Sequence, residues 1–168
     1  RLILERGLDI TWQAISRVDM INEEILYWMR KAGCIQISFG VESGSEKIRR
    51  LLNKTFTNVQ IEQAFSLTTR YGILSRAYFI YGCPGESRES IQESIELMRR
   101  IKPFGAVFYI LDLFPGTALY DVYRRLFGVT DDIWLDRIED ILYFETDPNL
   151  DRDQVLSFGR MLRAAFHE

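Results

Sequence analysis

The chain has 168 residues, of which 47% are hydrophobic, which is enough for one domain with a buried core. Its 21 basic and 24 acidic residues give a formal net charge of −3, so there is no electrostatic reason to expect a nucleic acid or an anionic membrane as partner. No apolar run approaches the roughly 20 residues that cross a bilayer, and no secretory signal is present, so we expect a soluble, cytoplasmic protein. The first residue is Arg1 rather than Met, which suggests a piece of a longer polypeptide.

The first half of the chain alternates between strand and helix patterns. A strand pattern at about 8–17 is followed by a helix whose apolar side chains recur at helical spacing and which ends at Gly33. A second strand pattern covers 34–42. The next helix begins with a capping box formed by Thr57 and Gln60.

The same alternation continues to about residue 114. A third strand is expected at 75–82, and a helix begins at about Ser87 and is stopped by Pro103. The last strand pattern covers 106–114. Alternating strands and helices with short links predict an α/β fold with right-handed βαβ units on one parallel sheet, in the order of the chain. We therefore expect a partial TIM-type (βα) barrel of about four parallel strands with covering helices.

The predicted strands have one polar face, which is unusual for a parallel sheet that is covered on both sides. In the second strand Ile35, Ile37, Phe39 and Val41 share one face, and we expect helices to cover it. The opposite faces of the strands are expected to line a wet concave surface or barrel interior. An open sheet with one solvated face is the alternative. The predicted lining residues are Asp9, Thr11, Gln13, Arg17, Gln36, Ser38, Glu42, Arg76 and Tyr78.

The last part of the chain has a different pattern. Asp151 and Gln154 form a capping box before a final amphipathic helix. The stretch before it, which contains Trp134, reads as a connector with a short helix. We therefore assign 1–120 to the barrel and 121–168 to a helical appendage packed on it.

The residues at the C-terminal ends of the predicted strands are candidates for a ligand site, because functional groups of α/β barrels collect there. Three of the four strand ends are glycine-bearing turns, where backbone can approach a ligand closely. Glu42 could accept hydrogen bonds from ribose hydroxyls or an amine, and Arg17 could bind a carboxylate with two hydrogen bonds. An internal Arg17–Glu42 salt bridge is the alternative.

The two cysteines, Cys34 and Cys83, are far apart and form no CxxC pair, so we interpret them as buried, reduced thiols. His167 is the only histidine. We therefore expect no self-contained zinc site or Cys–His catalytic site.

Three segments together resemble the radical S-adenosylmethionine (SAM) superfamily. Residues 37–45 (ISFGVESGS), followed by LLNK at 51–54, resemble the fourth strand and the segment after it. Residues 79–86 (FIYGCPGE) look like the fifth-strand motif, usually written GxIxGxxE. Residues 113–120 (LFPGTALY) resemble the exit of the sixth strand. The order and spacing of these motifs also match the superfamily, and the likeness covers about residues 1–120.

The resemblance implies a set of SAM contacts in this sequence. By similarity, Arg17 would contact the SAM carboxylate, Glu42 the ribose or the methionyl end, and Lys54 would be a basic residue near SAM. Tyr78 stands where several relatives place an acidic ribose ligand, so this sequence departs from the family pattern at that contact. The backbone around Ile80 and Gly82, with Leu113 on the next strand, would hold the adenine. The complete predicted set of cofactor-binding residues is Arg17, Glu42, Ser43, Lys54, Tyr78, Ile80, Gly82 and Leu113.

The resemblance also implies a 4Fe–4S cluster, which in this superfamily is held by a CxxxCxxC loop and cleaves SAM to a 5′-deoxyadenosyl radical. That loop would lie before residue 1, and Cys34 and Cys83 cannot replace it because their spacing is wrong. We therefore expect an enzyme in the full-length protein, with the upstream part of the same polypeptide as partner, and no activity in this chain alone.

The sequence leaves open which type of radical SAM protein this chain represents. The sequence looks most like the cobalamin-binding members, whose B12 domain would also lie upstream, and methylthiotransferases and coproporphyrinogen-oxidase-like members are the alternatives. A non-catalytic barrel that serves as a binding or scaffold module is a further one. A second copy of the chain could cover the strand edge at 8–17, which would make a homodimer.

Overall fold

The computed structural model describes residues 1–130 and 147–168. The connector predicted around Trp134 lies outside the described residues. The strands are β1 (Trp12–Ser16), β2 (Cys34–Glu42), β3 (Leu74–Tyr81) and β4 (Gly105–Ile110). The helices are α1 (Leu2–Glu5), the 3₁₀ helix η1 (Val18–Met20), α2 (Glu23–Lys31), α3 (Glu46–Leu51), α4 (Asn58–Arg70), α5 (Arg88–Ile101), α6 (Ala118–Phe127) and α8 (Arg152–His167). None of the helices in these ranges is long and apolar enough to cross a membrane.

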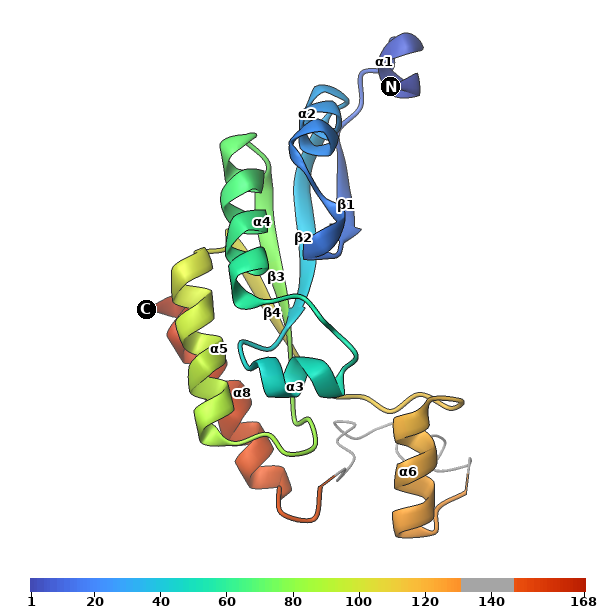
Figure 1. Ribbon diagram of the computed structural model, residues 1–168, viewed down its shortest axis with the longest axis vertical. Helices are drawn as coiled ribbons and strands as arrows, with labels where there is room; N and C mark the ends of the chain where they lie inside the picture. Colours follow the sequence, from blue (N-terminus) through green and yellow to red (C-terminus); the bar gives the residue numbers. More distant parts are fainter. Residues whose placement is uncertain (131–146) are drawn as a thin grey trace.

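The four strands form one parallel sheet in the order β1-β2-β3-β4, which confirms the predicted topology. Helices α4 and α5 lie on one face of this sheet, and α8 packs beside α5 and against β4 (Figure 1). Helix α6 stands apart from this layer, near the carboxyl ends of the strands (Figure 1). Among the described residues, side chains of the opposite face line a cavity.

The helix boundaries follow local signals in the sequence. Thr57 and Asp151 open α4 and α8 through the predicted capping boxes, and Ser87 opens α5 through a third one with Ser90. Gly33 ends the turn after α2 with φ 89°, and a Cβ there would lie 1.9 Å from the backbone oxygen of Ile10. Only glycine has both the conformation and the space that this turn needs.

The main core lies between the sheet and its helix layer. Ile37, Phe39 and Phe79 from the strands pack with Phe65 of α4 and Leu97 of α5, and all five are buried. Side chains of this kind contribute roughly 1.5–3 kcal/mol each when they leave water. The helix-covered face of the predicted pattern is therefore the real core face.

A second core cluster fixes α8 to the sheet. Val155, Phe158 and Leu162 of α8 are buried against Tyr81 of β3 and neighbouring side chains of α5. Gly159 allows the close approach, because a Cβ there would lie 2.6 Å from the ring of Tyr81. The last helix is thus seated on the face that α5 also covers.

Two strands are shorter than predicted. The first begins at Trp12 rather than at residue 8, because Trp12 pairs with Cys34, the first residue of β2, and residues 8–11 have no strand beside them. Asp9 and Thr11 accordingly lie outside the sheet. The fourth strand ends at Ile110 rather than at 114, because its partner β3 ends opposite it at Tyr81.

The predicted phase of β2 was wrong at Ile35. Trp12 pairs with Cys34 and Gln13 with Gln36, so Ile35 is the extra residue of a β-bulge. Cys34 takes the core position instead, and Ile35 is 38% exposed. A period of two cannot reveal such an insertion.

Candidate functional site

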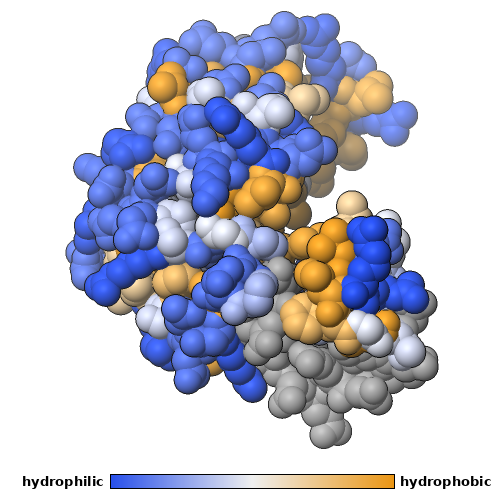
Figure 2. All heavy atoms as spheres, turned by 60° about the horizontal axis from the view of Figure 1, so that its bottom comes forward, coloured by the Kyte–Doolittle hydropathy of each residue, from blue (hydrophilic) through white to orange (hydrophobic). Residues whose placement is uncertain are grey.

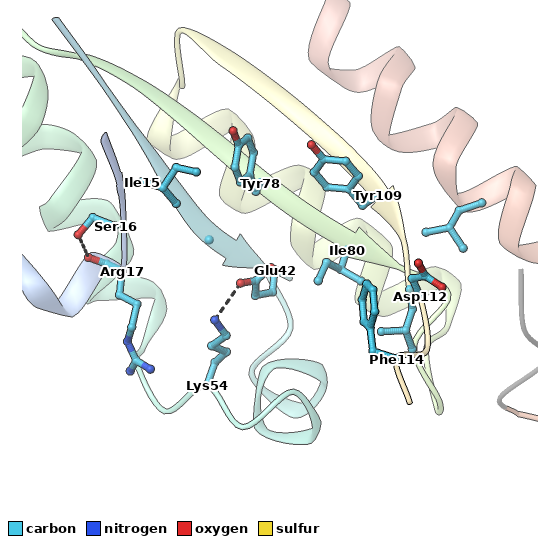
Figure 3. A pocket seen from close by; sticks show the side chains of 13 residues that line it. Ile15, Ser16, Arg17, Glu42, Lys54, Tyr78, Ile80, Tyr109, Asp112 and Phe114 are labelled. Carbon is cyan, nitrogen blue, oxygen red and sulfur yellow. Dashed lines mark hydrogen bonds and ion pairs between the residues drawn. The ribbon is translucent and has the colours of Figure 1, made fainter. Parts of the chain in front are cut away.

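A cavity of about 670 Å³ lies on the open face of the sheet, at the carboxyl ends of the strands. Figure 2 shows hydrophobic side chains facing a hollow in the surface, and Figure 3 shows the residues that line the cavity. The volume falls in the range of about 300–1,000 Å³ that is usual for small-molecule sites. The lining residues are Ile15, Ser16, Arg17, Gly40, Glu42, Lys54, Tyr78, Ile80, Tyr109, Ile110, Leu111, Asp112 and Phe114.

Five of the eight predicted site residues line this cavity. They are Arg17 after β1, Glu42 at the end of β2, Lys54 after α3, and Tyr78 and Ile80 on β3. Their side chains come from four separate segments of the chain, and the parallel order of the strands brings those segments to one edge. The structure thus places Arg17, Glu42 and Tyr78 on the same face, as the alternation predicts.

Glu42 ends β2 in a left-handed backbone conformation, with φ 66°. Gly40 pairs with Tyr78 and Glu42 with Phe79, so Val41 is the extra residue of a second bulge. The Glu42 carboxylate lies over Gly40, where a Cβ would be 2.5 Å from its Oε1 atom. A non-glycine residue in this conformation costs about 1–3 kcal/mol and is typical of functional sites.

Lys54 faces Glu42 across the rim of the cavity (Figure 3). The distance from Lys54 Nζ to Glu42 Oε1 is 3.0 Å, and the Glu42 side chain is only 11% exposed. The turn after α3 brings Lys54 to this place, since its backbone N–H donates to the carbonyl of Arg49 at 2.9 Å. A partly desolvated ion pair of this kind fixes both side chains more firmly than an exposed one.

Arg17 lies on the same rim but is paired with a residue that the sequence did not suggest. Its Nε and Nη2 atoms donate to the two carboxylate oxygens of Asp19 at 2.9 and 2.8 Å. The hydrogen bond from Arg17 holds the pKa of Asp19 below its usual range. The alternative of an Arg17–Glu42 salt bridge is therefore wrong, since the turn at η1 provides a nearer acid.

The floor of the cavity is mainly apolar and aromatic. Tyr78 and Tyr109 meet edge to face, with ring centroids 5.9 Å apart, beside Ile80 (Figure 3). Phe114 and Ile15 complete the wall and are 61% and 77% exposed. The sequence did not predict Ile15 and Tyr109 as lining residues. Tyr109 pairs with Ile80 in register, so the alternation in β4 was the signal that could have found it.

Ser43 and Leu113 do not line the cavity. The Ser43 side chain is buried and lies 3.2 Å from the hydroxyl of Ser94 on α5, so it ties the loop after β2 to the helix layer. Leu113 is buried against Tyr120 and Tyr123, beyond the end of β4. Their positions are explained by packing.

Gly82, the third predicted residue away from the cavity, belongs to a turn held by Glu86. The backbone N–H groups of Gly82 and Cys83 donate to Glu86 Oε2 at 2.5 and 3.3 Å. Glu86 is 6% exposed, and its Oε1 atom is buried with no hydrogen-bond partner in the described structure. Burial raises the pKa of Glu86 to about 7, although the two N–H donors act in the opposite direction.

Neither cysteine belongs to a cluster of possible metal ligands in the part of the chain that the structure describes. Cys34 and Cys83 are free and buried, and burial raises the pKa of both thiols. Within residues 1–130 and 147–168 there is no group of three or more His, Cys, Asp or Glu side chains that could hold a metal ion.

Comparisons of the sequence with known proteins agree on one family. Residues 1–98 match the Radical SAM superfamily. An uncharacterized methyltransferase of Pyrococcus horikoshii is 34% identical over 119 residues, which are 71% of this chain and 26% of the relative. The anaerobic magnesium-protoporphyrin IX monomethyl ester cyclase of Rubrivivax gelatinosus is 30% identical over 120 residues, or 70% of this chain and 22% of the relative. The chain therefore spans about a quarter of the length of these relatives.

Solved structures share the fold. The radical SAM methyltransferase TsrM from Kitasatospora setae superposes with a TM-score of 0.67 at 19% identity, over 76% of this chain and 25% of that one. Coproporphyrinogen III oxidase of Escherichia coli also gives 0.67, at 18% identity, over 98% of this chain and 36% of that one. At such low identities the superpositions are evidence for the fold alone. The family assignment rests on the sequence matches. This chain belongs to the radical SAM superfamily.

Proposed function

We propose that this chain supplies part of the SAM-binding site of a radical SAM enzyme. The observation that carries the proposal is the convergence of Arg17, Glu42 and Lys54 on one rim of a cavity with an apolar, aromatic wall. SAM has the matching distribution of groups, since a charged methionyl end and a ribose are joined to a flat, largely apolar adenine. Residues 1–120 would form the barrel part of the enzyme, and 121–168 a helical appendage.

The residues present fit SAM in their donors and acceptors. Glu42 can accept hydrogen bonds from the ribose hydroxyls or the ammonium group, and Arg17 can meet the carboxylate with its partly exposed guanidinium. Ile80 and the neighbouring tyrosines offer a face for the adenine. In this proposal these side chains bind and orient SAM and exclude water from it.

The residues present do not fit an iron–sulfur cluster. Two buried, widely separated thiols with raised pKa cannot act as the three thiolates that such a cluster needs. We therefore propose that a cysteine loop in an upstream part of the same polypeptide holds the cluster. When bound, the cluster would supply the electron for reductive cleavage of SAM.

Within the superfamily we propose the cobalamin-binding type. The similarity to TsrM, whose structure contains cobalamin and a 4Fe–4S cluster, and to the cobalamin-dependent enzyme OxsB supports it. Coproporphyrinogen III oxidase has an equal TM-score, and a tRNA-2-methylthio-N(6)-dimethylallyladenosine synthase is 23% identical over 129 residues, so these remain the alternative types. The free cysteines favour a reducing, cytoplasmic setting.

The test is SAM binding and 5′-deoxyadenosine formation by the full polypeptide after anaerobic reconstitution with iron and sulfide. We expect Glu42→Gln to raise the Kd for SAM about tenfold or more, because it weakens charge-assisted hydrogen bonds and leaves Lys54 without its partner. Glu23→Gln is the matched control, since Glu23 is exposed and pairs with Arg70 on the helix face. An unchanged Kd for SAM in Glu42→Gln would mean that SAM does not bind in this cavity.

A further inference from the structure

Arg49 is an anomaly of the fold. It lies in α3, and its side chain is buried completely, with 0% exposure. Burial lowers the pKa of Arg49, and the carboxylates of Glu46 and Glu93 offset this only in part. A buried guanidinium is costly, and an apolar side chain of similar volume is often as stable or more so at such a position. Its hydrogen bonds therefore call for a specific explanation.

The first of these bonds reaches the loop that presents Glu42. Arg49 Nη1 donates to the carbonyl of Ser43 at 2.6 Å. Ser43 directly follows Glu42, whose φ of 66° is a conformation that the backbone does not hold without support. Arg49 thus anchors the peptide unit next to the strained residue.

The second set of bonds reaches the segment that presents Lys54. Arg49 Nε donates to the carbonyl of Phe56 at 3.3 Å. The carbonyl of Arg49 in turn accepts from the N–H of Lys54 at 2.9 Å. The same residue therefore fixes both sides of the Glu42–Lys54 ion pair.

The ring of Phe56 extends this arrangement to Arg17. The guanidinium of Arg49 lies 5.8 Å from the ring centroid, and that of Arg17 lies 5.9 Å from the same centroid. Phe56 is 4% exposed, so it is a firm support between the two cations. Arg17, Glu42 and Lys54, the three residues that carry the proposed function, are thus each linked to Arg49.

We propose that Arg49 is a positioning residue for the SAM site: it holds the loop after β2 and the segment after α3 so that Glu42, Lys54 and Arg17 face one ligand. This inference rests on the proposed function for its ligand. Arg49 itself does not line the cavity, so its effect on binding must pass through Glu42 and its neighbours.

The test compares SAM binding by reconstituted full polypeptides that carry Arg49→Met, Glu42→Gln or both. We expect Arg49→Met to raise the Kd for SAM about tenfold or more, the effect of losing charge-assisted hydrogen bonds, with a much smaller change in kcat at saturating SAM. In the Glu42→Gln background the same change should raise Kd by less than about threefold, because the Glu42–Lys54 ion pair that Arg49 positions is already lost. Arg50→Met is the control, since Arg50 is the next residue of α3 and its side chain is 78% exposed.

An unchanged Kd in Arg49→Met, or effects that simply add in the double variant, would overturn the proposal in favour of a purely structural role. If Arg49→Met does not fold, Arg49→Lys decides instead. A lysine can reach only one of the two carbonyls, so we expect Arg49→Lys to have a higher Kd for SAM than the wild type, and a wild-type Kd would overturn the proposal.

A readout without SAM separates this inference from the proposed function. If the wild-type protein binds no SAM, the proposed function fails, and amide hydrogen exchange then tests Arg49 alone. We expect Arg49→Met to speed exchange selectively at 43–45 and 53–57 while the core strands keep their protection. Exchange that rises uniformly, or not at all, would contradict the positioning role.

Discussion

Glu42 occupies a backbone conformation that stability alone does not favour. Its φ of 66° would be easier for glycine, and the side chain finds room only because Gly40 beneath it has no Cβ. What the conformation achieves is a carboxylate that turns back over the sheet toward Lys54, on the cavity side. The strained backbone of Glu42 thus places a negative charge at the cavity, and backbone strain of this kind usually occurs at functional sites.

Glu86 links the fold to pH. Burial raises its pKa from the ordinary value of 4.5 to about 7, so between these values the folded chain keeps a proton that the unfolded chain releases. The free energy of unfolding should therefore fall as the pH rises through this window, by roughly 3 kcal/mol in total. We expect Glu86→Gln to lose this decline and to exceed the wild type in stability at about pH 8, as measured by urea unfolding at several pH values.

The control for this prediction is Glu96→Gln, on the exposed side of α5, which should leave the pH dependence as it is. A glutamine at position 86 can still accept the N–H of Gly82, so loss of that hydrogen bond would not obscure the result. An unchanged pH slope in Glu86→Gln would show that another group is responsible.

The elements could be predicted from sequence where their signals are local. The capping boxes at Thr57 and Asp151 mark helix starts within a few residues, and Pro103 follows the end of α5 at Ile101. The bulges at Ile35 and Val41 could not be predicted, because they depend on the register of a neighbouring strand.

The site was predictable to a similar extent. The motif and the strand phase predict that Arg17 and Glu42 lie on one rim. They do not reveal that Arg17 donates two hydrogen bonds to the carboxylate of Asp19. Leu113 was placed on a strand that ends before it, so its real contacts with Tyr120 could not be anticipated. No local sequence pattern predicts that Arg49 is buried, since a basic residue in a short helix is usually exposed to solvent.

The packing of α8 on β3 gives a prediction at the scale of elements. Ala for Gly in a helix usually stabilises it by about 1 kcal/mol. At Gly159 we expect the opposite sign, because the new Cβ would lie 2.6 Å from the Tyr81 ring and must push the helix off the sheet. Thermal unfolding should show a lower Tm for Gly159→Ala.

Arg160→Ala, at the neighbouring exposed position of α8, is the matched control and should change the Tm little. A Tm for Gly159→Ala at or above that of the wild type would mean that α8 does not rest on Tyr81 in solution.

For the molecule as a whole, residues 1–168 alone should neither bind a 4Fe–4S cluster nor cleave SAM. The chain spans about a quarter of its relatives, and its two cysteines are buried apart from each other. Anaerobic reconstitution with iron and sulfide, followed by absorbance and an assay for 5′-deoxyadenosine, is the measurement. A stoichiometric cluster on this chain would contradict our account of where the iron ligands lie, and the full polypeptide is the positive control.

The strand order also has a consequence for how the chain folds. Because β1, β2, β3 and β4 are neighbours in the same order as in the sequence, each strand finds its partner's edge already present when it leaves the ribosome. Among these four strands, none has to wait for a later one to be inserted between it and its partner. Helix α8 packs back onto α5 and β4 only after all four strands exist. The sheet can therefore grow one βα unit at a time during synthesis, with docking of the last helix as the closing step.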